Sequence, residues 1–461
     1  MHIASCMVFE GPAPDWDALQ AHIESRLHLV PKYRQRIAEV PLGQGRPVWV
    51  DDPHFRLSYH LRHAALPAPG GASELARLCG RVFASQLDRA KPLWEIYLVE
   101  GMADGRFALL SKTHHALVDG ISGIDLTAVL FDLERTPGDD LEPQAAWSPR
   151  PLPTSAELLA DALIERATIP SEIQRAVNAS IRGPRTAVSG IAKRIGAISS
   201  LASAGTSPAP PTPLNVPIGS HRRFAWMTSD LADFKEIKNG FGGTVNDVVL
   251  ATVAGALGSW LRSKGHPTRE LELRAMVPVS VRPEEGRGDL GNQVAVMWAP
   301  LPVGETDPAR RLEIITEAMS HVKESGQAVG AKTLTELSGF APQTVLAQAA
   351  RLVPRQRFYN VVVTNVPGPQ FPLYLLGQKL EEAHPMVPLA EQQGLGIAVM
   401  SYNGKLDFGL NADWDAVPDV DLFAEDLRLS LMELRKVARA RRKHRTASAK
   451  RGADSAVKLA K

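Results

Sequence analysis

Two periodic patterns of apolar residues divide the chain into strands and helices. Short alternating or continuous apolar runs are typical of buried strands, and apolar residues spaced three or four apart are typical of helices with one buried face. In the first part of the chain the patterns predict strands at 3–9, 46–50, 56–61, 95–100 and 106–113, and helices at 16–29, 74–86 and 121–133. This mixture of the two kinds of element predicts an α/β fold.

The same patterns return after residue 214. They predict strands at 223–228, 274–281, 293–301 and 361–365, and helices at 231–239, 246–262, 308–327 and 421–442. Asn403-Gly404 separates two further apolar runs, 396–402 and 405–410, and is a strong signal for a β-hairpin.

The segment 136–213 has a different composition, rich in Pro, Ala and Ser. Within it, 155–167 and 171–182 have the spacing of amphipathic helices, and 188–201 has a weaker one. Because these helices have apolar faces, we interpret the segment as a helical crossover that packs on the body. Contact of the same faces with a membrane is the alternative.

A chain of 461 residues is long for a single core, so two domains are expected. We expect an N-terminal domain at 1–135, the crossover at 136–213, a C-terminal domain at 214–442, and a disordered basic tail at 443–461. Hydrophobic and charged fractions of 44% and 22% are typical of soluble globular proteins.

Several observations point to the cytoplasm. The two cysteines, Cys6 and Cys79, are far apart in sequence, which indicates a reducing compartment and no disulfide framework. Residues 1–9 lack the basic start and the cleavage site of a secretory signal. The longest apolar run, 248–261, is too short to span a bilayer. We therefore expect a cytoplasmic protein, peripheral to the inner membrane or to lipid inclusions.

Charge is distributed unevenly along the chain. Between residues 435 and 461 there are eleven Lys or Arg and one acid, Asp454, which gives this end a charge of +10. The whole chain is +2, so the remainder is −8. A polybasic end attracts anionic lipid or nucleic acid. Because this end lacks aromatic residues to stack on bases, we expect a membrane and no nucleic acid. A solvated end without a specific partner is the alternative.

One segment carries a recognisable chemistry. His114 and His115 follow a predicted strand and precede a predicted helix, with Asp119 and then Gly120 close behind. A histidine titrates near neutral pH, so at a strand end it can take a proton from an alcohol or an amine. Adjacent strand residues point to opposite faces, so one of the two histidines is expected to face a substrate. A buried core histidine and a metal site are the alternatives.

A covalent intermediate is not expected. No basic residue is directly adjacent in sequence to Cys6 or Cys79 that would activate it as a nucleophile. The chain also lacks the Gly-x-Ser-x-Gly elbow of α/β-hydrolases. Direct transfer between two bound substrates fits these observations better.

The histidine segment matches the HHxxxDG motif of the CoA-dependent acyltransferase superfamily. Four further segments match motifs of one branch: Pro92-Leu93-Trp94, Asn246-Asp247, Pro278 to Arg282 with Gly291-Asn292, and Asn365-Val366-Pro367-Gly368-Pro369. In this order, over residues 2 to about 435, they make the chain resemble the bacterial wax ester synthase/acyl-CoA:diacylglycerol acyltransferases. One departure is the opening Met1-His2-Ile3-Ala4-Ser5, which lacks the family's Leu-Ser-Pro-x-Asp segment and indicates a misplaced start codon or a truncation.

The resemblance implies two chloramphenicol-acetyltransferase-like domains, each a mixed sheet flanked by helices. It implies transfer of a long-chain acyl group from acyl-CoA, a co-substrate, to diacylglycerol or a fatty alcohol, with no cofactor. Two alternative hypotheses remain: a condensation-type enzyme with a carrier-bound donor, and a catalytically impaired protein that binds lipid inclusions.

The resemblance also assigns roles to individual residues. His115 would be the general base, His114 would support the loop, and Asp119 would be structural. The expected partner of Asp119 is Arg34, with Arg282 as second choice. Asn246 would line the substrate tunnel opposite His115, and Gly120 would lie at the substrate.

Overall fold

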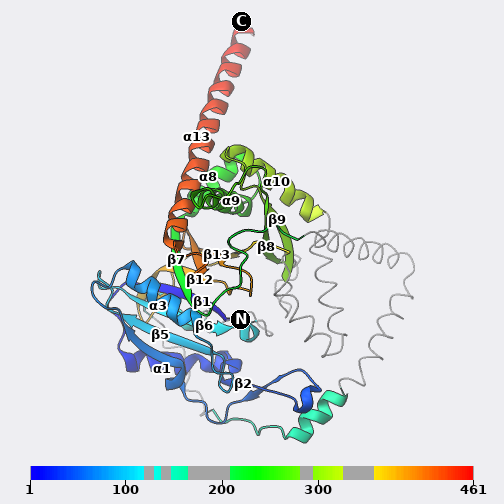
Figure 1. The fold of residues 1–461 in the computed structure, drawn as a ribbon. Coiled ribbons are helices and arrows are strands. Elements are labelled where there is room, and N and C mark those ends of the chain that lie inside the picture. Colours follow the sequence, from blue (N-terminus) through cyan, green and yellow to red (C-terminus); the bar gives the residue numbers. More distant parts are fainter. Residues whose placement is uncertain are drawn as a thin grey trace, which may run out of the picture.

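The computed structural model describes residues 2–118, 129–136, 147–164, 208–280, 294–324 and 358–459. They form two lobes, each built on a six-stranded mixed sheet (Figure 1). The structure therefore confirms the predicted α/β fold with two sheet-and-helix domains.

The sheet of the N-terminal lobe contains strands from both halves of the chain. Its order is β11-β12-β1-β6-β5-β4, and only the β4–β5 pair is parallel. The strands are β1 (His2–Phe9), β4 (Leu61–Ala65), β5 (Trp94–Glu100), β6 (Phe107–His114), β11 (Tyr374–Leu375) and β12 (Gln378–Met386). Beside this sheet, β2 (Gln35–Ala38) and β3 (Val48–Asp51) form a separate antiparallel pair.

Helices cover both faces of this sheet. Helix α1 (Trp16–Arg26) packs Leu19 and Ile23 against one face, and α3 (Ala72–Ala84) packs Leu75 and Cys79 against the other. The predicted strand at 56–61 is wrong, because the short helix α2 (Leu57–His60) occupies most of it and β4 starts at Leu61. Leu57 and His60, spaced three apart, are both buried, which is a helical spacing.

The C-terminal lobe has the sheet order β7-β14-β13-β10-β8-β9. The strands are β7 (Arg222–Asp230), β8 (Leu273–Ser280), β9 (Val294–Leu301), β10 (Val361–Pro367), β13 (Leu395–Tyr402) and β14 (Lys405–Asp413). Helices α8 (Leu231–Phe241), α9 (Val245–Ser263), α10 (Pro308–Glu324) and α13 (Val420–Leu459) share one large core with this sheet (Figure 1). Asn403 and Gly404, both at positive φ, close the predicted hairpin between β13 and β14.

The division into contiguous domains needs one correction. Strands β11 and β12 lie within the expected C-terminal domain, yet they belong to the sheet of the N-terminal lobe, where β12 pairs with β1. The two lobes meet closely here: a Cβ added at Gly409 of β14 would lie 1.6 Å from the carbonyl oxygen of Pro385. A second close approach joins α3 to β7, where a Cβ at Gly80 would lie 2.6 Å from the oxygen of Arg222.

A buried charged cluster lies at the junction of β12 with the C-terminal lobe. His384 is fully buried, with its Nε2 3.0 Å from Glu382 and its Nδ1 3.4 Å from Asp407 of β14. Its ring stacks on Trp226 of β7 at 4.6 Å between centroids. Burial alone would lower the pKa of His384, but the two carboxylates outweigh it and raise this pKa to about 9. The cluster thus holds an imidazolium between the lobes.

Arg106 and Thr228 extend this cluster on its two sides. Arg106 lies 2.9 Å from Glu382, and the Thr228 hydroxyl donates to Asp407 at 2.5 Å. The hydrogen bond from His384, together with Arg106, lowers the pKa of Glu382 to about 2 despite burial.

The crossover is described only in part. Residues 155–164 are helical, as the spacing predicts, and Ala162 is buried beside Gly45 of the N-terminal lobe. Just before this helix, Arg150 contacts Asp51 at 3.0 Å. The described part therefore packs on the body, while the expected helices at 171–182 and 188–201 lie outside the described residues.

The basic end differs from the expected disordered tail. Helix α13 continues through Leu459 and projects from the body (Figure 1). Ala, Arg and Lys are strong helix formers and dominate this stretch, which accounts for the extension. Four arginines of the basic end, at 435, 439, 441 and 442, contact Asp233, Glu236 or Glu313 on α8 and α10. Part of the +10 charge is therefore paired with the body.

Candidate active site

The histidine doublet lies where the sequence predicts, at the end of a central strand. His114 is the last residue of β6, which runs between β1 and β5, and His115 opens the short helix α4 (His115–Val118). Both histidines are partly exposed. Because β6 is hydrogen-bonded on both sides, it fixes the backbone from which the doublet projects.

His114 makes two contacts that fix the turn into α4. The backbone N–H of His114 donates to the carbonyl oxygen of Leu93 at 2.9 Å. The ring Nδ1 of His114 accepts the backbone N–H of Ala116 at 3.2 Å. Burial, followed by the charges of the chain's amino group and His115, lowers the pKa of His114. A neutral ring that accepts at Nδ1 carries its proton on Nε2.

The Pro92-Leu93-Trp94 segment is joined to the doublet through the bond to Leu93. Trp94 is buried and donates from its indole nitrogen to the carbonyl oxygen of Tyr33 at 2.8 Å. His60 stacks on it at 4.6 Å, and the His60 Nδ1 lies 2.8 Å from the carbonyl oxygen of Trp94. A carbonyl oxygen only accepts, so Nδ1 is the protonated nitrogen of His60. The motif is thus a packed support beside the doublet.

Sequence reasoning missed two residues beside the doublet. His2 on β1 is paired in register with His114, and their rings meet edge to face at 5.8 Å. Burial is the main reason why the pKa of His2 is lowered to about 4, so a third, neutral imidazole adjoins the doublet. No short stretch of sequence signals this contact, because it depends on the pairing of β1 with β6.

Lys112, two residues before His114, is also buried. Its Nζ lies 3.1 Å from Glu95 on β5 and donates to the Ser85 hydroxyl at 2.7 Å, after the end of α3. Burial lowers the pKa of Lys112, and Glu95 opposes that shift. A lysine inside an apolar strand is the sequence signal for such a buried pair. Through Lys112, two residues before His114, the pair connects β6 with β5 and with the end of α3.

Two motifs of the C-terminal lobe meet in the structure. Asn246, in the first turn of α9, accepts a hydrogen bond from the side-chain amide of Asn365 on β10 at 3.3 Å. Asp247 accepts the N–H of Thr244 at 2.7 Å and closes a capping box. Thr244 is therefore the N-cap of α9, two residues before the predicted start of this helix at Asn246. Asp247 is buried, whereas Asn246 is partly exposed.

The other predicted site residues are described only in part. Arg34 is at the end of a short 3-10 turn, with its guanidinium 5.2 Å from the ring centroid of Trp147. Burial lowers the pKa of Arg34. Its expected partner Asp119, together with Gly120 and Arg282, lies outside the described residues. The Arg34–Asp119 pair therefore stays a prediction.

No group of three or more His, Cys, Asp or Glu that could hold a metal ion occurs among the described residues. None of the described helices is by itself long and apolar enough to cross a membrane. Helices α8 and α9 together have that length and apolar composition, but they meet at a bend of 99°.

Comparison with known proteins gives matches over nearly the whole chain. Residues 1–249 match the model of the wax ester synthase/diacylglycerol acyltransferase catalytic domain, and residues 290–435 match that of the WS/DGAT C-terminal domain. A Mycobacterium tuberculosis protein named "probable diacylglycerol O-acyltransferase" is 34% identical over 458 residues, which cover 99% of this chain and 95% of that protein.

Solved structures agree with these matches. The wax ester synthase/diacylglycerol acyltransferase from Marinobacter aquaeolei VT8 aligns with a TM-score of 0.65 at 29% identity, over 95% of both chains. The first condensation domain of the CDA synthetase aligns with a TM-score of 0.54 at 16% identity, over 94% of this chain and 91% of that one, which shows a shared fold. The chain therefore belongs to the wax ester synthase/diacylglycerol acyltransferase family, and it is an acyltransferase.

Proposed function

We propose that the protein moves a long-chain acyl group from acyl-CoA to the hydroxyl of diacylglycerol or of a long-chain alcohol, which yields triacylglycerol or wax ester. The observation that carries this proposal is the histidine doublet at the end of β6, within a chain that matches the family over nearly its full length. The names of its relatives supply the class of acceptor.

His115 is the general base in this proposal. It takes the proton of the acceptor hydroxyl while that oxygen attacks the thioester carbonyl carbon. The carbon–sulfur bond then breaks, and the CoA thiolate recovers the proton from the imidazolium. His114 holds the turn through its bond with Ala116, which supports an orienting role. Asp119 stabilises the loop by pairing with Arg34 or Arg282, Gly120 keeps the backbone close to the substrate, and Asn246 faces the substrate from the C-terminal lobe.

An assay of the purified protein with palmitoyl-CoA tests this function. The acceptors are dipalmitoylglycerol, hexadecanol and glycerol, and release of free CoA and formation of the lipid product are both measured. We expect turnover with one or both long-chain acceptors and none with glycerol. Binding of acyl-CoA without turnover on any acceptor would contradict the proposal and favour a lipid-inclusion binding protein.

We predict that no acyl-enzyme forms, because transfer is direct. Incubation with radiolabelled palmitoyl-CoA alone should leave no label on the denatured protein, since the chain lacks a Gly-x-Ser-x-Gly elbow and both cysteines are buried. Cys79 is buried, and burial raises its pKa, which disfavours a thiolate nucleophile. A stoichiometric label that hydroxylamine releases would show a covalent route instead.

We further propose that the basic end of α13 holds the enzyme at an anionic membrane or at a lipid inclusion in the cytoplasm. Deletion of 443–461 removes six Lys or Arg but keeps the arginines that contact α8 and α10. Each basic residue near an anionic surface contributes about 1 kcal/mol. The deletion should therefore abolish co-sedimentation with phosphatidylglycerol vesicles at low salt, where screening is weak.

A control separates charge from length in this vesicle experiment. A full-length variant with the same six residues changed to Gln should lose binding as the deletion does. Equal sedimentation of all three proteins at low and high salt would refute the tether.

A further inference from the structure

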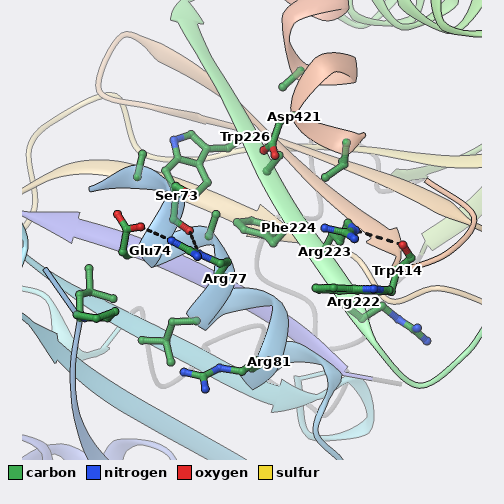
Figure 2. Close-up of a pocket in the computed structure, with 18 of the residues that line it drawn as sticks. Ser73, Glu74, Arg77, Arg81, Arg222, Arg223, Phe224, Trp226, Trp414 and Asp421 are labelled. Carbon is green, nitrogen blue, oxygen red and sulfur yellow. Dashed lines mark hydrogen bonds and ion pairs between the residues drawn. The ribbon is translucent and has the colours of Figure 1, made fainter. Parts of the chain in front are cut away.

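A groove of about 650 Å³ lies at the junction between the two lobes (Figure 2). Helix α3 forms one wall, with Ser73, Ala76 and Arg77. Strand β7, Trp414 and the first turns of α13 form the other wall. His114, His115 and Asn246 do not line it. Its volume is in the range of small-molecule sites.

The groove has an excess of positive charge. Four arginines line it, at 77, 81, 222 and 223, against two acids, Glu74 and Asp421. Two of the arginines are committed: Arg77 contacts Glu74, and Arg222 donates to the carbonyl oxygens of Gly219 and His221. The guanidinium groups of these two arginines already have partners, so the other two arginines decide which ligand the groove can bind.

The other two arginines are Arg81 and Arg223, one on each wall. Within the described part of the chain, the Arg81 side chain has no hydrogen-bond or ion-pair partner, and it is exposed on α3. Arg223 lies over the ring of Trp414 at 3.6 Å and donates from Nε to the Trp414 carbonyl oxygen, which leaves its two terminal nitrogens for a ligand. Guanidinium groups in this state bind carboxylate or phosphate.

The rest of the lining is largely apolar. It consists largely of small aliphatic side chains, including Ala65, Pro67, Ala76 and Ala424. His384 covers one face of the Trp226 ring, and Arg223 covers one face of the Trp414 ring. Such a surface accommodates an alkyl chain along the groove, with its charged end between the two walls.

We propose that this groove binds a single long-chain amphiphile with an anionic head, its alkyl chain along α3 and its head at Arg81 and Arg223. The ligand would contact both lobes at once, because α3 belongs to the N-terminal lobe and β7 to the C-terminal lobe. This inference does not rest on the proposed function, since it concerns binding outside the doublet. The head is a carboxylate, as in a fatty acid, or a phosphate, as in a lysophospholipid.

Photo-cross-linking of the full chain tests this proposal. The probes are palmitate, 1-palmitoylglycerol 3-phosphate and hexadecanol, each with a diazirine in its alkyl chain, and mass spectrometry locates the label. We expect the anionic probes to label the groove segments 72–84, 222–230 and 414–424, and hexadecanol to label them far less. Stronger labelling by palmitate would identify a fatty acid ligand, and stronger labelling by the phosphate probe a lysophospholipid.

Three variants make this test specific. Arg81→Glu should weaken labelling of the groove by about tenfold or more, because it removes a charge-assisted hydrogen bond and adds repulsion. Ala76→Trp should block labelling by filling the groove without a change of charge. Arg269→Glu makes the same charge change at an exposed arginine outside the groove and should label as the unmodified protein does. Label elsewhere in the chain should be equal in all variants.

The contrary outcomes are equally defined. The proposal is overturned by absence of label from the groove segments or by equal labelling with hexadecanol. Labelling that survives both Arg81→Glu and Ala76→Trp overturns it as well. Displacement of the anionic probes by 3′,5′-ADP would also overturn it, because the groove would then hold a nucleotide.

Discussion

Replacing His115 with alanine should lower the turnover number by about 100- to 10,000-fold, the usual contribution of a general base. The residue is partly exposed at the start of α4, so its side chain contributes little to the core. The thermal midpoint should therefore stay near that of the unmodified protein. Turnover with palmitoyl-CoA and each long-chain acceptor, beside a thermal melt, measures both effects.

Two matched variants sharpen this result. His266→Ala removes an exposed histidine of the C-terminal lobe and should leave turnover unchanged. His114→Ala should reduce turnover less than His115→Ala and should also lower the thermal midpoint, because it removes the acceptor of the Ala116 N–H. If His115→Ala retained near-normal turnover with every acceptor, His115 would not be the base.

The second large effect is expected at the junction of the lobes. His384→Gln should destabilise the fold by about 3–5 kcal/mol, because it leaves the buried carboxylate of Asp407 without its compensating imidazolium. Urea denaturation at pH 7 measures the loss. The double variant His384→Gln/Asp407→Asn removes both charges and should recover much of this stability. A loss below about 1 kcal/mol in the single variant would show that the cluster is not an ion pair.

The same cluster predicts how stability changes with pH. The pKa of His384 is about 9 in the folded protein, above the ordinary value of 6.5, so protonation stabilises the fold fully below pH 6.5. This contribution should fall as the pH rises through 9. The pKa of Glu382 is lowered to about 2 from 4.5, so its contribution is complete above pH 4.5 and is lost toward pH 2. Thermal melts should show the decline between pH 6.5 and 9 in the unmodified protein and not in His384→Gln.

Local patterns predicted much of the fold and the position of the histidine doublet at a strand end. The strand before the doublet, the hairpin at Asn403-Gly404 and the amphipathic helices that fall within the described residues each carry their own signal in a short window, and these elements are present. The helix predicted at 121–133 lies mostly outside the described residues. The doublet at the end of β6 follows from the same kind of signal. By contrast, the strand at Gln378–Met386 contains two glutamates and Pro385, and its partner strand lies at the other end of the chain.

The remaining site contacts depend on pairing that no short window reveals. The bond between Asn246 and Asn365 joins residues more than a hundred positions apart. The contact of His2 with His114 requires β1 to lie beside β6. The burial of Lys112 requires the end of α3 to pack against its side chain. Such contacts arise from strand order and helix placement, which hydrophobic spacing does not encode.

Strand β12 comes from the C-terminal part of the sequence but completes the sheet of the N-terminal lobe, and this limits how the enzyme can be divided into fragments. A fragment that ended in the crossover would present the backbone of β1 as an open sheet edge, with unpaired N–H and C=O groups along residues 4–9. Such edges recruit strands from other molecules, so this fragment should aggregate rather than fold. A soluble N-terminal half would need the sequence of β11 and β12 attached to it. In this acyltransferase, the segment that completes the first sheet is synthesised late, at residues 374–386 of 461, so the N-terminal lobe cannot be finished until most of the chain has left the ribosome.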